Sequence, residues 1–114
     1  PPTITFTPAN LQEGVSLSFE ASVTDNELVS PTGTKIWYRK IGSPNATFTS
    51  ADFTNTSGAG NLTTRNFNIT VNPSWYDAMG LEFYIEAEDG SGNKGRSPAD
   101  NTKYHYSYIK YTTD

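Results

Sequence analysis

Residues 15–25 read VSLSFEASVTD, and this stretch decides the fold class. Apolar side chains stand at every second position: Val15, Leu17, Phe19, Ala21 and Val23. Ser, Glu or Thr fills the positions between them. Successive residues of a β-strand point to opposite sides, so a period of two places the apolar side chains on one face. We therefore expect a half-buried strand whose apolar face packs on the core.

The same alternation recurs along the rest of the chain. Further runs stand at residues 4–6, 34–41, 46–53, 65–71, 81–89 and 103–113. Only NPSWYDAMG favours a helical turn, with Asn72 as its cap, Pro73 in the first position and Gly80 at its end. The pattern predicts an all-β fold, an immunoglobulin-like sandwich of about seven antiparallel strands in two sheets.

Composition limits the kind of protein and its partners. The 114 residues suit one domain, residues 1–114, which we interpret as a fragment of a larger multidomain chain. Eight Lys and Arg stand against twelve Asp and Glu, giving a net charge of −4, so we expect no nucleic-acid partner. No apolar run approaches the roughly 20 residues of a membrane span, so we expect no membrane insertion. The chain has no cysteine, which excludes disulfides and thiolate metal sites.

Residues 86–100, EAEDGSGNKGRSPAD, space their oxygen-bearing side chains like an EF-hand calcium loop that begins at Asp89. An EF-hand loop follows a helix, but the residues before Asp89 alternate as a strand. Lys94 stands where the loop requires Gly, and Asp100 stands where it requires Glu. We therefore predict a hairpin connection, rich in Gly, Asn and Asp because these residues accept a positive φ.

A second calcium hypothesis concerns one pole of the expected sandwich. The loops after the second and sixth strands of an immunoglobulin-like sandwich lie at the same pole. This arrangement would bring together Asp25, Asn26, Glu27, Asp89 and Asn93. Clustered carboxylates and amides suit a hard cation, so calcium is the one cofactor that the sequence suggests. The alternative is that Asp25 and Asp89 cap turns through backbone N–H groups.

An aromatic set is the strongest candidate for ligand binding. Trp37 and Tyr84 point outward from neighbouring strands if the isoleucines beside them face the core. Tyr106 and Tyr108 join them if Ile109 also faces inward. Such a flat row suits stacking on sugar rings or packing against another domain. The alternative is that the rings form cross-strand pairs over the aliphatic parts of Lys and Arg.

Catalytic constellations are weak in this sequence. His105 is the single histidine, and no nucleophile stands on a strained turn beside it. Glu82 and Glu86 share the outer face of one expected strand, opposite Lys35 and Arg39. Cross-strand charge pairs explain these glutamates without catalysis. We therefore expect that the protein is not an enzyme.

Three segments resemble bacterial extracellular immunoglobulin-like or fibronectin type III-like modules. They are ASVTDN at 21–26, IWYRK at 36–40 and LEFYIEAEDGSGNKG at 81–95. Such modules lie between the catalytic or adhesive domains of large secreted and surface proteins, although the antibody-type cysteine pair is missing here. The resemblance implies a non-catalytic spacer or interaction module at the bacterial cell surface or outside the cell. Its partners would be the neighbouring domains of the same polypeptide, polysaccharide or another surface protein, and the isolated domain would be monomeric. The alternative function is carbohydrate binding through the aromatic row.

Overall fold

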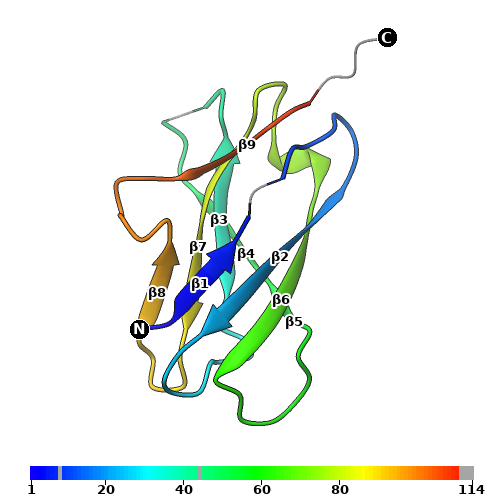
Figure 1. Ribbon diagram of the computed structural model, residues 1–114. Coiled ribbons are helices and arrows are strands. Elements are labelled where there is room, and N and C mark those ends of the chain that lie inside the picture. Colours follow the sequence, from blue (N-terminus) through cyan, green and yellow to red (C-terminus); the bar gives the residue numbers. More distant parts are fainter. Residues whose placement is uncertain (8, 44, 111–114) are drawn as a thin grey trace.

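The computed structural model describes residues 1–7, 9–43 and 45–110, which form two antiparallel sheets packed as a sandwich (Figure 1). In spatial order, the first sheet contains β1 (Thr3–Phe6), β2 (Leu17–Thr24), β6 (Thr64–Val71) and β5 (Thr54–Asn55). The second contains β4 (Thr49–Asp52), β3 (Lys35–Lys40) and β7 (Gly80–Glu88), and both β8 (Lys94–Ser97) and β9 (His105–Tyr108) pair with β7. The predicted all-β, two-sheet antiparallel sandwich is confirmed.

Among the described residues, nine strands stand where about seven are expected, because β5 and β8 lie outside the expected runs. β4 falls within the run at 46–53, whereas β5 follows it on the other side of the buried Phe53 and pairs with the other sheet. β9 falls within the expected last strand at 103–113, and β8 precedes it, separated from it by an excursion at residues 98–104. The expected hairpin connection is therefore wrong for residues 94–97, which form β8. Residues 111–113 of the expected last strand lie outside the described part of the chain.

The core forms from the inward faces that the alternation predicts. Buried members of the predicted set include Phe19, Ala21, Val23, Phe67, Ile69, Val71, Leu81, Phe83, Ile85 and Ala87. Val15 is the exception, with 48% of its surface exposed. It lies in a turn before β2 begins, where its N–H donates to the Gln12 carbonyl at 3.1 Å. The predicted inward facing of Val15 is therefore wrong.

The predicted helical turn is present but shorter than expected. A single 3₁₀ turn spans Pro73–Trp75, and the Asn72 side chain caps it by accepting a hydrogen bond from the Ser74 N–H at 2.9 Å. Gly80 does not end this turn. It begins β7 instead, with φ of 125°, and a Cβ atom there would overlap the Ser107 carbonyl oxygen of β9. Close strand pairing thus explains this glycine.

The chain enters and leaves the sandwich at opposite poles (Figure 1). Thr3 at the start of β1 pairs with Thr24 at the end of β2, and this end is called the N-terminal pole. Tyr108 at the end of β9 pairs with Gly80 at the start of β7, and this end is called the C-terminal pole. The molecule is elongated, with extents of 47 × 28 × 18 Å.

The N-terminal segment joins both sheets. After β1, Leu11 forms a parallel bridge with Ile109 just beyond β9. The Leu11 N–H donates to the Tyr108 carbonyl at 2.9 Å, and the Lys110 N–H donates to the Leu11 carbonyl at 2.8 Å. The Leu11 side chain is fully buried. This segment therefore closes one edge of the sandwich. Among the described residues, no helix has the length and apolar character needed to cross a membrane.

Candidate functional site

The predicted aromatic residues gather on the outer face of the second sheet. Trp37 of β3 and Tyr84 of β7 are cross-strand partners, with ring centroids 6.1 Å apart and planes 11° apart. On β9, Tyr106 and Tyr108 stack in the same way, at 6.1 Å and 12°. Ile109 is half-buried and packs against the core, as the predicted outward facing of the tyrosines requires.

Two arginines cover part of this aromatic face. The Arg96 guanidinium carbon lies 4.3 Å from the centroid of the Tyr84 ring. The Arg39 guanidinium carbon lies 4.2 Å from the centroid of the Phe48 ring. Tyr104 lies 5.5 Å from both guanidinium carbons, between the two arginines in this cation–π cluster. One face of Tyr84 is therefore occupied by the protein itself.

The exposed part of the aromatic face lies toward the C-terminal pole. Tyr106 and Tyr108 keep 41% and 56% of their surface exposed, whereas Trp37 and Tyr84 are half-buried. Burial, followed by the charge of Glu82, raises the pKa of Tyr106, so its phenol stays neutral at physiological pH. The four predicted residues thus share one face, divided into a covered pair and an exposed pair. Their binding of a ligand stays a prediction.

Two outer-face glutamates form ion pairs: Glu82 with the expected Arg39, and Glu86 with Lys94, at 3.7 Å, in place of the expected Lys35. Arg39 donates to Glu82 Oε1 through Nε at 3.0 Å and through Nη2 at 2.5 Å. This pair confirms cross-strand charge pairing between β3 and β7. Lys35 lies opposite Glu86 but pairs instead with Asp52 of β4, at 2.6 Å. No catalytic arrangement is needed to explain these carboxylates.

At the N-terminal pole, the loops after β2 and β7 meet as the sequence predicts. Val29, in the first loop, forms a bridge with Asp89 in the second. Asp25 and Asp89 are both buried, with 8% and 3% of their surface exposed. Asn26 and Glu27 are exposed. The structure therefore brings the two aspartates together and leaves Glu27 in solvent.

Asp89 caps the turn that follows it. Its Oδ1 accepts hydrogen bonds from the backbone N–H groups of Ser91 and Asn93, both at 2.9 Å. Its Oδ2 accepts one from the Asn93 side-chain amide at 3.0 Å. Burial acts to raise the pKa of Asp89, but these hydrogen bonds and a contact with the Asp25 side chain outweigh it and lower the pKa to about 2. The turn-capping arrangement is therefore present.

The same geometry is a poor match to a calcium site. In the described ranges, no group of three or more His, Cys, Asp or Glu side chains is placed to hold a metal ion. A cation at Asp89 would have to compete with three N–H donors. Asp25 Oδ2 is buried and has no hydrogen-bond partner among the described residues. Calcium binding stays a prediction.

His105 is placed inside the fold and not in an open cleft. Its Nε2 lies 2.8 Å from Ser97 Oγ, across the excursion at residues 98–104. Its ring packs 5.4 Å from the Phe6 and Phe83 rings. Burial, with the charge of Arg96 as the second cause, lowers the pKa of His105. The hydrogen bond between Ser97 and His105 thus joins the two ends of the excursion at residues 98–104.

Arg65 has a structural role that the sequence analysis missed. The residue is 2% exposed and donates to three carbonyl oxygens, those of Val29 at 2.8 Å, Gly58 at 2.9 Å and Gly60 at 2.5 Å. These hydrogen bonds hold the loops of the N-terminal pole against β6. The available signal was its position two residues before Phe67, on the inward face of the predicted strand.

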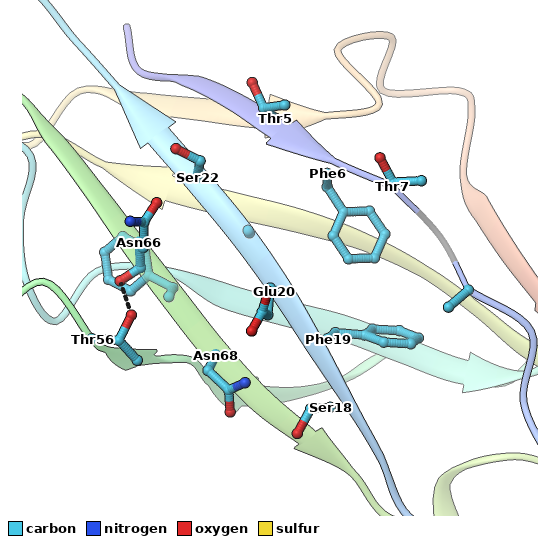
Figure 2. Close-up of a pocket in the computed structure, with 13 residues that line it drawn as sticks. Thr5, Phe6, Thr7, Ser18, Phe19, Glu20, Ser22, Thr56, Asn66 and Asn68 are labelled. Atoms are coloured by element: carbon cyan, nitrogen blue, oxygen red, sulfur yellow. Dashed lines mark hydrogen bonds between the residues drawn. The ribbon is translucent and has the colours of Figure 1, made fainter.

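A groove crosses the outer face of the first sheet, on the side opposite the aromatic residues (Figure 2). Its volume is about 680 Å³. Its lining combines polar and apolar residues, and the polar ones include Thr5, Ser18, Glu20, Ser22, Asn66 and Asn68. In the sequence these residues alternate with apolar ones, which indicates an outward facing but no groove.

Comparison with protein-family models gives no match, and comparison with curated protein sequences gives none either.

Proposed function

We propose that this chain is a non-catalytic, immunoglobulin-like or fibronectin type III-like module of a bacterial secreted or cell-surface protein. It acts there as a spacer or interaction unit between neighbouring domains of the same polypeptide. The observation that carries the proposal is the placement of chain entry and chain exit at opposite poles. Domains joined at opposite poles extend in line, whereas domains joined at one pole fold back on each other.

The entry segment supports this proposal because it is part of the packed structure. Pro2 is buried, and a Cβ atom at Gly95 of β8 would overlap the Pro2 carbonyl oxygen. The backbone of the entry segment therefore lies directly on β8. A preceding domain attached to such a segment would have a restricted direction, unlike one attached through a flexible linker.

A tandem of two copies, joined end to end, tests the spacer proposal by small-angle X-ray scattering. We expect a maximum dimension of about twice the 47 Å of one module. The matched control carries ten Gly and Ser residues at the junction, and we expect its distance distribution to broaden. A compact tandem, no longer than one module and with the two copies side by side, would contradict the spacer role.

Carbohydrate binding by the aromatic face is a second candidate function, and the exposure of Tyr106 and Tyr108 favours it. Exposed, stacked rings are available to the apolar face of a sugar. Affinity electrophoresis on soluble and insoluble glycans tests it. We expect Tyr106→Ala and Tyr108→Ala to abolish any retardation that this face causes. Retardation that both variants retain would rule the aromatic face out.

A further inference from the structure

We propose that the groove on the first sheet is a binding site for a neutral oligosaccharide, separate from the aromatic face. The proposal goes beyond the spacer role and does not depend on it. The groove spans neighbouring strands, and Figure 2 shows its polar side chains on β1, β2 and β6. Glu20 of β2 lies directly opposite Asn68 of β6, and Ser22 lies opposite Asn66.

The floor of the groove offers hydrogen-bonding groups that the protein does not use. The side chains of Ser18, Glu20, Ser22 and Asn68 make no hydrogen bond or ion pair to another described residue. At the rim, the Thr56 hydroxyl is engaged, because it donates to the Asn66 carbonyl at 3.1 Å (Figure 2). Directly opposite side chains on paired strands are separated by about 5 Å. The free groups thus form a compact array that one ligand can contact simultaneously.

The charge of the groove selects the ligand. None of the chain's Lys or Arg side chains lines it, so an anionic ligand finds no counter-charge there. Glu20 is the single charged residue of the lining, and an ionised carboxylate only accepts hydrogen bonds. Two neighbouring sugar hydroxyls can donate to its two oxygens. Asn68 and Asn66 both donate and accept through their amides, as sugar hydroxyls also do.

An apolar wall completes the match to a sugar. Phe6 is half-buried at the end of β1 and lies on the β1 side of the groove (Figure 2). The ring is held by edge-on contacts to Phe19 at 5.4 Å and to Phe83 at 5.6 Å. Phe6 lies opposite the inward-facing Ala21, whereas Glu20 and Ser22 point outward, so its ring lines the groove from the core side of the sheet. A pyranose ring presents hydroxyls at its edge and C–H groups on its faces, so it suits a groove with a polar floor and an apolar base. The half-buried Phe6 ring distinguishes the groove from a merely solvated polar sheet face.

Affinity electrophoresis with the whole domain tests the proposal. The neutral probes are mannan, dextran, mixed-linkage β-glucan and arabinoxylan, and the acidic probes are polygalacturonate and alginate. We expect at least one neutral glycan to retard the domain and both acidic ones to leave it unaffected. Retardation by none of the neutral glycans, or by the acidic ones alone, would overturn the proposal.

Variants then locate the site. Glu20→Ala combined with Asn68→Ala should weaken binding to the retarding glycan by about tenfold or more, because it removes a charged acceptor and an amide. The matched control, Glu13→Ala combined with Asn101→Ala, removes one exposed carboxylate and one exposed amide outside the groove lining and should leave the Kd unchanged. The Glu20 and Asn68 side chains have no described protein partner, so the melting temperature should stay near that of the parent. Unaltered glycan binding by the first double variant, or loss of glycan binding by the second alone, would show that the groove is not the binding site.

Discussion

Arg39 and Glu82 form the least exposed ion pair of the described residues, with 16% and 7% of their side-chain surface accessible. The pair joins β3 to β7 beneath the aromatic cluster. It contrasts with Lys35–Asp52 on the same sheet, whose side chains are 40% and 67% exposed. The two pairs differ in burial, so they allow a matched comparison.

Removing one partner of the buried pair should strongly destabilise the fold. We expect Glu82→Ala to lower the free energy of unfolding by about 3 kcal/mol, because it leaves the Arg39 charge desolvated and unpaired. The control, Asp52→Ala, should cost less than about 1 kcal/mol, since solvent already screens that pair. Urea denaturation of both variants measures the difference. Equal losses would show that the burial of Arg39 and Glu82 carries no energetic weight.

His105 should make stability depend on pH near neutrality. Burial and the Arg96 charge lower its pKa below the ordinary 6.5, so the unfolded chain binds more protons than the folded one between the two values. The stability present above 6.5 is therefore lost as the pH falls from 6.5 toward the lower folded value. Thermal melting from pH 7.5 to about 5 measures the slope.

Replacing His105 with Gln provides the control for this pH dependence. The Gln amide can keep a hydrogen bond to Ser97 Oγ but has no proton to gain in this range. We expect the melting temperature of this variant to change less between pH 7.5 and about 6. A parent-like slope in His105→Gln would assign the effect to other groups.

Calcium should leave the melting temperature unchanged if Asp89 acts as a turn cap. Both oxygens of this carboxylate already accept hydrogen bonds. A bound ion at a hundredfold excess over its Kd would instead add about 2.7 kcal/mol and raise the melting temperature by roughly 10 °C. Melting in calcium and then in chelator separates these outcomes. A calcium-dependent rise that Asp25→Asn abolishes would establish the ion site and overturn the capping interpretation.

Gly95 should be intolerant of a side chain. We expect Gly95→Ala to displace the entry segment and to destabilise the domain by about 1–3 kcal/mol, because its Cβ would overlap the Pro2 carbonyl oxygen. Gly90→Ala is the matched control, since a Cβ there meets its nearest atom, the Leu28 carbonyl oxygen, at 3.5 Å. Denaturation and proteolysis near the N-terminus report the two effects. A neutral Gly95→Ala would mean that the segment is not packed on β8.

Period-two alternation predicted most of the architecture because it reports which side of a strand is buried. It placed Trp37 and Tyr84 side by side on the outer face, as found. It did not predict β5, which follows the buried Phe53 and pairs with the other sheet, because a strand of two residues leaves no periodic signal. Leu11 was missed for the same reason: its bridge to Ile109 depends on a single apolar residue.

The surroundings of the predicted sites were harder to derive. Arg96 covers Tyr84 only because residues 94–97 form β8, and the sequence analysis assigned them to a connection. Asp89 was left with two interpretations, since its hydrogen bonds depend on how the turn closes. The groove depends on how β1 departs from β2 beyond Phe6. Alternation identifies outward residues such as Glu20 but does not indicate where the surface of the sheet is grooved.

The parallel bridge between Leu11 and Ile109 also determines how the module responds to tension. The residues before Leu11 lead to the start of β1 at the N-terminal pole. Ile109 lies just after β9, at the C-terminal pole. Pulling the two ends apart therefore slides these segments past each other along their length. The hydrogen bonds on either side of Leu11 lie across the direction of pulling, so they are strained together and not opened one after another. Extraction of the buried Leu11 side chain opposes the same movement.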